Sequence, residues 1–341
     1  MIHHDLDILH LSRLSSICRK LSFSSCPIVV AMSGGGDSMA LATILAAFTK
    51  IPWHSGFVQH NLRGNESLRD ESFIRSIPDL LKSFPNPPLS FQIMPGIPEN
   101  GWTGNSLEST ARKIRYLQLE HLAKALKSPI VATGHTRNDQ AETVMLRLLR
   151  GCGINGLGSM RFSRKLGNGI RLVRPLLQFT RQELRELLIK KKVPWLEDSS
   201  NSFSAFERNF LRIEVFPVLK ARWGSRPEQF FPRIASQARR LNSTVSRLLD
   251  KEIASLELPR AGTRIVWHSG KTKSLCHPML SDCLHRLWVR EKWPMSDWSY
   301  KKFSRLAAFI RGTGQLEQLP NGWKIYLDTY VIRFDPPEDL S

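Results

Sequence analysis

The sequence lacks the features that mark several other classes of protein. It contains no run of about 18 apolar residues, so no segment is predicted to span a membrane. Its first residues resemble neither a signal peptide nor an arginine-rich transit peptide. Its five cysteines are scattered and include no Cys-x-x-Cys pair, which disfavours disulfide bonds and a zinc site. We therefore expect a cytoplasmic protein with reduced thiols and no membrane partner.

Acidic residues are scarce relative to basic ones. The 341-residue chain contains 49 Lys and Arg against 30 Asp and Glu, which gives a net charge of +19. The excess lies after Asn105, because the residues up to that point contain as many acidic as basic side chains. A positive excess of this size, placed in one part of the chain, predicts a polyanionic partner, most simply a nucleic acid.

A glycine-rich turn follows the first apolar stretch. PIVVAM, which ends at Met32, is predicted to be a buried parallel strand, and MALATILAAF is apolar at helical spacing. Between them, backbone N–H groups at a helix N-terminus would bind a phosphate that glycine allows to approach closely. An ordinary tight turn is the alternative, and a Walker A loop is excluded because its lysine is absent. The predicted phosphate-binding loop consists of Ser33, Gly34, Gly35, Gly36, Asp37 and Ser38.

The first half of the chain alternates strand-like and helix-like stretches. This alternation predicts an α/β fold with a doubly wound parallel sheet, whose ligands bind beyond the carboxyl ends of the strands. The segments Ser33–Ser38, His60–Arg63 and Gly134–Asp139 all follow predicted strands. An amphipathic helix is expected over residues 1–21. We expect a phosphate-binding, catalytic domain over residues 1–215. We expect a basic, mainly helical domain over residues 216–341, which binds the nucleic acid and ends in a small hairpin.

Further polar residues with functional potential follow these strands or share helix faces. Each has an ordinary structural explanation when taken singly, since acids favour helix starts and arginines favour solvated faces. The candidates are His60, Arg63, Arg112, Arg115, His135, Asp139, Glu142, Arg208 and Arg212.

Taken together, these residues stand in the order and spacing of a known family. The sequence Ser-Gly-Gly-x-Asp-Ser resembles the pyrophosphate loop of the ATP pyrophosphatase, or PP-loop, superfamily. The whole set resembles the tRNA(Ile)-lysidine synthases over roughly Pro27 to Pro217. Beyond the loop, the matching segments are His60–Arg63 with Asp70–Glu71, Ala111–Tyr116, Gly134–Thr143, Arg150–Leu157, Arg174–Leu177, Trp195–Asn201 and Arg208–Arg212.

The resemblance implies an adenine-nucleotide alpha-hydrolase-like fold and a two-step reaction. The substrates would be ATP, L-lysine and an isoleucine tRNA with a CAU anticodon. The 2-carbonyl oxygen of the wobble cytosine would attack the α-phosphorus of ATP, and pyrophosphate would leave. The ε-amine of lysine would then displace AMP and give lysidine. A homodimer is a possible assembly.

The resemblance also implies residue roles. The Ser33–Ser38 loop would hold the pyrophosphate, and Asp37 would hold Mg²⁺. The catalytic residues would be Asp37, His135, Asp139 and Glu142, with an acid such as Asp139 or Glu142 orienting the lysine ammonium or taking its proton. RNA or ATP phosphates would contact His60, Arg63, Arg112, Arg115, Arg208 and Arg212.

Three positions depart from the family pattern, and three other functions stay open. Asn138 replaces an acid, Thr136 stands where a second histidine is usual, and Cys152 replaces a small residue. A PP-loop tRNA thiolase would also adenylate a base, but it usually needs paired or catalytic cysteines. A small-molecule amide ligase would leave the basic region unexplained. A non-catalytic RNA-binding protein with a relict nucleotide loop would not need the acids that this sequence retains.

Overall fold

The computed structural model describes most of the chain. The described residues are 12, 13, 16, 26–60, 65–97, 107–158, 160–167, 169–197, 207–260, 264–295, 297–315, 319, 322–335 and 337. The helix expected over residues 1–21 therefore lies almost entirely outside them. The chain divides into two compact units, Met1–Ala238 and Arg239–Ser341, and the boundary between them falls inside helix α10 (Arg226–Leu256).

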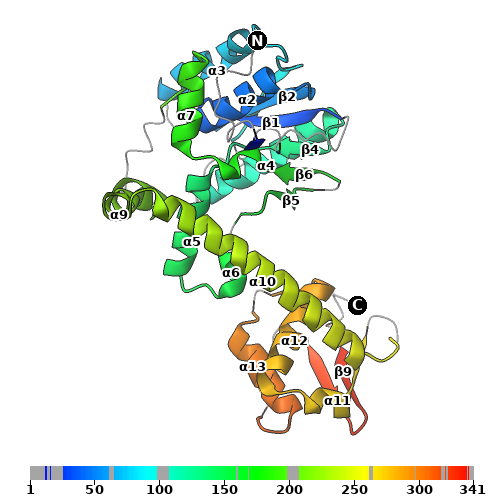
Figure 1. The fold of residues 1–341 in the computed structure, drawn as a ribbon. Coiled ribbons are helices and arrows are strands. Elements are labelled where there is room, and N and C mark those ends of the chain that lie inside the picture. The colour runs from blue at the N-terminus through cyan, green and yellow to red at the C-terminus, as the bar shows by residue number, and fades with distance from the viewer. Residues whose placement is uncertain are drawn as a thin grey trace. The chain divides into compact units, whose positions relative to one another are not determined.

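The first unit is built on a six-stranded sheet with the order β3-β2-β1-β4-β6-β5 (Figure 1). The first five strands in this order are parallel, and β5 pairs antiparallel with β6 as an edge strand. The strands are β1 (Ile28–Met32), β2 (Trp53–Gln59), β3 (Phe91–Pro95), β4 (Ile130–Ala132), β5 (Ser163–Lys165) and β6 (Arg171–Val173).

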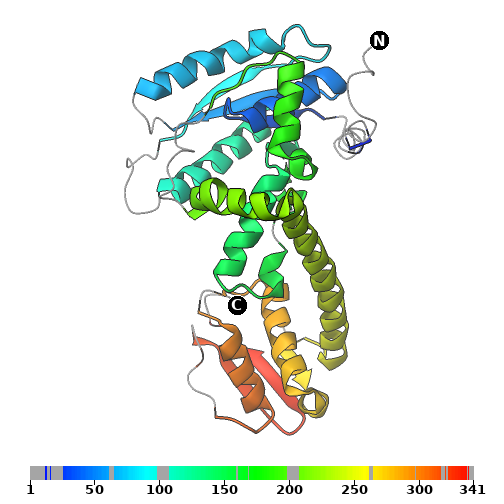
Figure 2. The same ribbon diagram turned by 60° about the vertical axis from the view of Figure 1, so that its left-hand side comes forward.

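Helices cover both faces of this sheet, which confirms the doubly wound fold predicted from the alternation (Figure 2). One core joins the sheet to α2 (Gly36–Phe48), α3 (Asn65–Leu81) and α7 (Arg181–Lys190). The other joins it to α4 (Leu107–Ala125). The strand order reverses between β1 and β4, so the loops after these two strands flank the switch point where such sheets bind ligands.

The remaining helices of this unit extend from the β4 side. They are α5 (Arg137–Leu149), α6 (Ile154–Leu157), the 3₁₀ turn η1 (Pro175–Gln178), α8 (Glu207–Phe210), the π-helical turn η3 (Leu211–Val215) and α9 (Phe216–Trp223). The sequence predicts a helix broken before Pro217, but α8, η3 and α9 follow one another without a break. The wider π turn precedes the residue whose ring and missing N–H disturb regular helical bonding.

The second unit combines helices with a three-stranded sheet of order β7-β9-β8. Its core is rich in tryptophan, with Trp288 packed against Trp293, Trp298 and Trp323. Its further elements are β7 (Ile265–His268), α11 (Ser269–Ser274), α12 (His277–Glu291), α13 (Tyr300–Ile310), β8 (Lys324–Leu327) and β9 (Val331–Asp335). The expected closing hairpin is β8–β9, and β7 adds a third strand to it.

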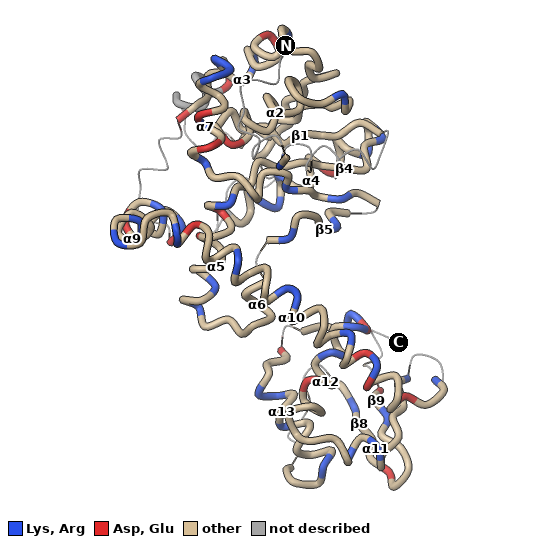
Figure 3. The backbone as a smooth tube through the Cα atoms, in the orientation of Figure 1, with Lys and Arg blue, Asp and Glu red and all other residues tan. Residues whose placement is uncertain are grey.

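Lys and Arg recur along α10 and on α13 (Figure 3). In the part of the chain that the structure describes, every helix is too short or too polar to cross a lipid bilayer.

Candidate active site

The glycine loop between β1 and α2 is shaped by one glycine and left open at another. Gly34 has φ of +76°, a conformation that side chains disfavour, and a Cβ there would come within 2.8 Å of Leu196. Gly35 has an ordinary extended backbone and is the N-cap of α2. Among the described residues, a Cβ on Gly35 would meet only the hydroxyl of Ser33, at 3.5 Å. The open side of the loop therefore lies at Gly35.

Two serines hold the loop in place. The hydroxyl of Ser38 donates to the carbonyl of Gly35 at 2.9 Å, and it lies 3.1 Å from the hydroxyl of Ser33. No side chain caps the 13-residue helix α2, because its N-cap residue is a glycine. A helix N-terminus without a capping acceptor presents donors and positive potential to an anion. This geometry supports the prediction of a phosphate-binding loop.

Two other segments close around the loop. A Cβ on Gly134 would lie 2.8 Å from the backbone carbonyl carbon and oxygen of Asp37, so only glycine lets the β4–α5 loop reach the first turn of α2. On the other side, Leu196 donates its backbone N–H to the carbonyl of Gly34 at 2.9 Å, and Trp195 lies against Gly36. The segments after β1, after β4 and after α7 thus meet at one point.

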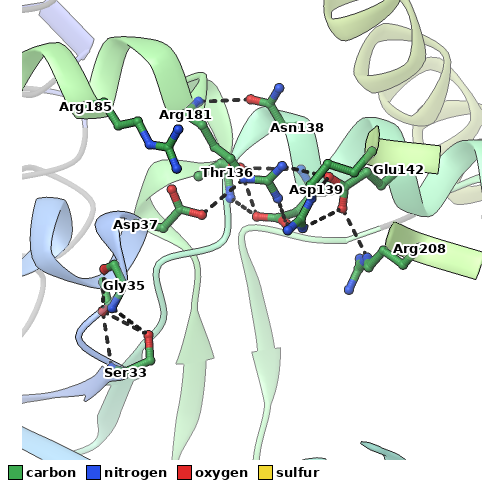
Figure 4. Close-up of polar contacts among 12 residues, drawn as sticks. Ser33, Gly35, Asp37, Thr136, Asn138, Asp139, Glu142, Arg181, Arg185 and Arg208 are labelled. Atoms are coloured by element: carbon green, nitrogen blue, oxygen red, sulfur yellow. Dashed lines mark hydrogen bonds and ion pairs between the residues drawn. The ribbon is translucent and has the colours of Figure 1, made fainter. Parts of the chain in front are cut away.

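Three of the predicted catalytic acids meet at one arginine that the sequence analysis did not single out (Figure 4). The guanidinium of Arg181 lies 2.5 Å from a carboxylate oxygen of Asp139, 2.8 Å from Glu142 and 3.4 Å from Asp37. Arg181 opens α7, Asp37 lies in the first turn of α2, and Asp139 lies in the first turn of α5. Three helix N-termini therefore converge on the same cluster of charges.

The predicted arginines of the helix α8 region complete this cluster. Arg212 approaches Glu142 at 3.1 Å, and Arg208 approaches it at 3.2 Å while donating to the hydroxyl of Thr143 at 2.8 Å. The side chain of Glu142 is only 2% exposed. We call Asp37, Asp139, Glu142, Arg181, Arg208 and Arg212 the acid–arginine network. Its three acids and three arginines balance in formal charge.

The surroundings raise the pKa of one aspartate of the network and lower the pKa of the other. Burial raises the pKa of Asp37 to about 6, with the negative charge of Asp139 adding to the shift and Arg181 opposing it. Burial would also raise the pKa of Asp139. The positive charge of Arg181 and the backbone N–H of Thr136, which donates at 2.7 Å, outweigh it and hold this pKa at about 2. Asp139 is thus a permanent anion near neutral pH.

His135 lies beside the network as a neutral side chain. Burial lowers the pKa of His135 to about 4, and the positive charges of Arg174, Arg112 and Arg208 lower it further against the attraction of Asp139. Its Nδ1 is 2.8 Å from the hydroxyl of Thr133. The structure thus brings His135 and Arg112 into the electrostatic surroundings of the predicted site.

The remaining predicted site residues lie near the end of β2 or on α4, or fall outside the described residues. His60 follows β2, where its Nδ1 is 2.8 Å from the carbonyl of Gly96. Burial lowers the pKa of His60, and the charge of Arg115 on α4 contributes in the same direction. Arg63 lies outside the described residues. Glu71 lies in the second turn of α3, where it accepts hydrogen bonds from Gln59 and Arg75.

The departures from the family pattern have local explanations. The side-chain oxygen of Asn138 accepts from the backbone N–H of Arg181 at 3.0 Å, and its amide donates to Glu228 at 2.9 Å. Asn138 therefore ties the starts of α5, α7 and α10 together. Thr136 is fully buried and caps α5 through a capping box with Asp139.

Arg181 could have been found from the sequence by one signal. Thr180 and Glu183 form a capping box, which fixes the start of α7 immediately before Arg181. A cation in the first turn of a helix faces the positive end of the helix dipole. An arginine at that position is therefore expected only where acids from other segments surround it.

The residues of the loop fit a magnesium ion that a nucleotide helps to hold. Mg²⁺ is usually bound through one or two carboxylates together with substrate phosphates. Asp37 supplies a carboxylate in the first turn after the loop. Among the described residues, no three His, Cys, Asp or Glu side chains are grouped so as to hold a metal ion by themselves.

Comparison with known proteins gives consistent matches. A family model described as the PP-loop domain matches residues 10–219. The chain is 35% identical to a tRNA(Ile)-lysidine synthase of Gloeobacter violaceus over 67% of this chain and 68% of that protein. It is 34% identical to one of Chlorobaculum tepidum, over 68% and 70%. It is 38% identical to one of Symbiobacterium thermophilum over 58% of this chain, but it spans only 40% of that longer protein.

Proposed function

Because this chain belongs to the PP-loop family and, within it, to the tRNA(Ile)-lysidine synthases, we propose that it ligates L-lysine to carbon 2 of a tRNA wobble cytidine. The substrates are ATP, L-lysine and an isoleucine tRNA with a CAU anticodon, and the products are the modified tRNA, AMP and pyrophosphate. The reaction runs through an adenylated base. The proposal covers the whole activity, which relatives such as that of Symbiobacterium thermophilum carry on longer chains.

One observation carries the proposal most directly. An open glycine loop and a buried set of acids lie side by side where three helix N-termini converge. The loop suits the phosphates of ATP, and the acids Asp139 and Glu142 suit the ammonium group of lysine. A reaction that joins a nucleotide-activated base to a cationic amine needs both kinds of subsite next to each other.

The first step depends on the loop between Ser33 and Ser38. Backbone N–H groups at the start of α2 would stabilise the negative charge that develops on the departing pyrophosphate. Asp37 would hold Mg²⁺, which supplies further neutralisation of phosphate charge when it is bound. His135, whose pKa burial lowers to about 4, would be neutral at pH 7 and would act as a hydrogen-bonding group rather than as a cation.

The second step depends on the acids that Arg181 gathers. The pKa of Asp139, held at about 2 by Arg181 against the effect of burial, makes this carboxylate a very weak base. Asp139 would therefore orient the lysine ammonium rather than remove its proton. Glu142, which is 2% exposed, would contribute the second carboxylate of this subsite and would take the proton that the ammonium must lose before the ε-amine attacks carbon 2 and AMP leaves. Arg208 and Arg212 keep that carboxylate in place and would be available to phosphates.

The test is direct transfer of labelled lysine. Purified protein, ATP, Mg²⁺, radiolabelled L-lysine and transcribed CAU-anticodon isoleucine tRNA are incubated, and label is measured in the RNA. We expect label only with ATP and none with the Asp139→Asn variant. A transcript with cytidine 34 replaced by uridine is the matched RNA control. Wild-type protein that binds ATP and tRNA but incorporates no lysine would contradict the proposal.

The thiolase alternative is tested by one cysteine. Cys152 follows α5, and its backbone N–H bonds to the carbonyl of Arg147, which is about 12 Å along the helix from Asp139. This placement favours a spacer role. We expect Cys152→Ala to keep most of the lysine transfer. If the variant folds but no longer modifies tRNA, the result would favour the thiolase function over lysine ligation.

A further inference from the structure

Two guanidinium groups lie over one tyrosine ring next to the site. The Cζ atom of Arg112 is 5.1 Å from the centre of the Tyr116 ring, and that of Arg164 is 4.9 Å from it. Arg112 also donates to the Tyr116 hydroxyl at 3.0 Å. Arg112 and Tyr116 come from α4, whereas Arg164 comes from the edge strand β5. Such stacking fixes the planes of flexible arginines and leaves their N–H groups free to point outward.

A third arginine joins this group from the end of β6. Arg174 is only 4% exposed, and it donates to the carbonyl of Arg161 at 2.8 Å. Burial lowers the pKa of Arg174. The side chain of Tyr116, with which Arg174 forms a hydrogen bond, opposes this shift, whereas the positive charges of Arg164 and Arg112 add to it. We call Arg112, Tyr116, Arg164 and Arg174 the Tyr116 cluster.

The Tyr116 cluster differs from the acid–arginine network in its charge balance. In the network each arginine faces a carboxylate. In the cluster, by contrast, Arg112, Arg164 and Arg174 form no ion pair with an Asp or Glu of the described ranges. A buried positive charge such as that of Arg174 normally has an anionic partner, and the exposed Arg112 and Arg164 place two more positive charges beside it. Three such charges without an acid point to an anion from outside the chain.

The position of the cluster favours a polynucleotide over ATP. The strand order β1-β4-β6-β5 separates β5 from the glycine loop by three strand spacings, about 14 Å at ~4.8 Å each. Residues 161–174, which form the β5–β6 hairpin, contain five Lys and Arg and no Asp or Glu. Residues 106–238 contain 24 Lys and Arg against 11 Asp and Glu, so the first unit holds most of the positive excess. An RNA strand can reach this edge while its base occupies the active site.

We propose that the Tyr116 cluster binds a backbone phosphate of the RNA substrate. This inference rests on the proposed function for the identity of that substrate. The guanidinium groups of Arg112 and Arg164 donate to the phosphate oxygens, and Tyr116 holds their planes. Arg174 supplies charge from below the surface.

The hairpin offers a matched pair of variants. Arg164 pairs in register with Leu172, which lies in the core facing α4, so its side chain lies on the α4 face of the sheet. Arg171 pairs with Lys165 and donates to Ser163 at 3.0 Å, which places it on the opposite face of the same hairpin. Both arginines are exposed. Arg164→Gln and Arg171→Gln therefore remove the same charge from the same hairpin but from opposite faces.

Binding of the tRNA transcript is measured by filter binding at several salt concentrations. We expect Arg164→Gln to weaken binding about tenfold, as loss of a charge-assisted contact does. We also expect it to reduce the slope of log affinity against log salt by about 0.7 to 0.9, the value for one phosphate. Arg171→Gln should keep the wild-type slope. The KM for ATP should stay the same in both.

Three results would overturn the inference. Equal affinities and slopes for the two variants would show that the α4 face of the hairpin has no special role. A higher KM for ATP in Arg164→Gln, with tRNA affinity unchanged, would assign the cluster to the nucleotide. If the wild-type protein binds no tRNA, both this inference and the proposed function are contradicted. If wild-type protein binds tRNA but transfers no lysine, the proposed function fails while the two variants still decide the site.

Discussion

Replacing Arg181 with glutamine tests whether one side chain holds the candidate active site together. The variant removes the guanidinium that contacts Asp37, Asp139 and Glu142. Breaking a buried ion pair by removing one partner costs about 3–5 kcal/mol. The cost here should be lower, about 2–4 kcal/mol, because Arg212 still lies 3.1 Å from Glu142 and 3.9 Å from Asp139. The free energy of unfolding, measured by urea denaturation at pH 7, should fall by that amount.

The loss should depend on pH in a defined direction. In the wild type the pKa of Asp139 is about 2, depressed by Arg181 against the effect of burial, and the usual value is 3.8. A depressed carboxyl pKa stabilises the fold above the usual value, and this contribution is lost as pH falls through the folded value. Without Arg181, burial should raise the pKa of Asp139 instead. The stability deficit of Arg181→Gln should therefore be largest near pH 7 and should shrink as pH falls below about 4.

A control on the same helix separates this effect from general damage to α7. Arg185 lies one turn further along, is 49% exposed and pairs with Glu197 at 3.4 Å. Exposed pairs contribute about 0.2–1 kcal/mol, so Arg185→Gln should cost little. Adding Asp139→Asn to Arg181→Gln should recover part of the loss, because it removes an uncompensated charge. The reasoning is refuted if Arg181→Gln is as stable as Arg185→Gln at pH 7, or if its deficit does not change on acidification.

Three further predictions follow from local geometry. Gly34→Ala should lower the free energy of unfolding by about 1–3 kcal/mol, because Gly34 has a positive φ and close contacts. Gly35→Val should keep the stability of the wild type but lose ATP-dependent pyrophosphate release. Equal stabilities of the two variants would contradict this prediction. Burial raises the pKa of Asp37 to about 6, so the free energy of unfolding of the wild type should fall by up to about 3 kcal/mol as pH rises from 4 to 8. The Asp37→Asn variant should not show this fall. If the stabilities of the two proteins, measured with urea in EDTA, change with pH in parallel, the prediction is wrong. Asn138→Asp should lower the free energy of unfolding by about 1–3 kcal/mol, because it places a carboxylate beside Glu228. In the double variant, Glu228→Gln should recover part of this loss. Additive effects of the two substitutions would disprove the coupling.

Much of the sheet could be predicted from the sequence, and the part that could not has a physical reason. Strands β1 and β2 are apolar or alternate with burial, and each is bounded by turn residues, so their patterns are strong. The strands β5 and β6 have only three residues each, and β5 is Ser-Arg-Lys at the edge of the sheet. None of the three residues of β5 is buried, so this edge strand carries no hydrophobic period. Its pairing is set by β6 and not by its own composition.

The motif residues of the candidate site could be predicted from the sequence, but the ion pairs between them could not. The loop, His135, Asp139 and Glu142 come together as expected, because the strand ends that carry them meet at one switch point. Arg181 was missed because it belongs to no motif. The capping box before it marks only its place in the first turn of α7, and its contacts to three acids appear only in the folded chain. The run of three glycines also does not reveal which of them has a positive φ, and the structure places it at Gly34, whereas Gly35 has an extended backbone.

Asn138 shows how a departure from a family pattern can be absorbed by contacts far away in the sequence. An acid at this position could accept from the backbone N–H of Arg181, but it could not donate to Glu228. An asparagine does both, since its oxygen accepts while its amide donates. The neutral side chain also leaves the network with three acids for three arginines, a balance that a fourth carboxylate would disturb. The amide of Asn138 is therefore matched by a hydrogen bond to Glu228, ninety positions later in the chain.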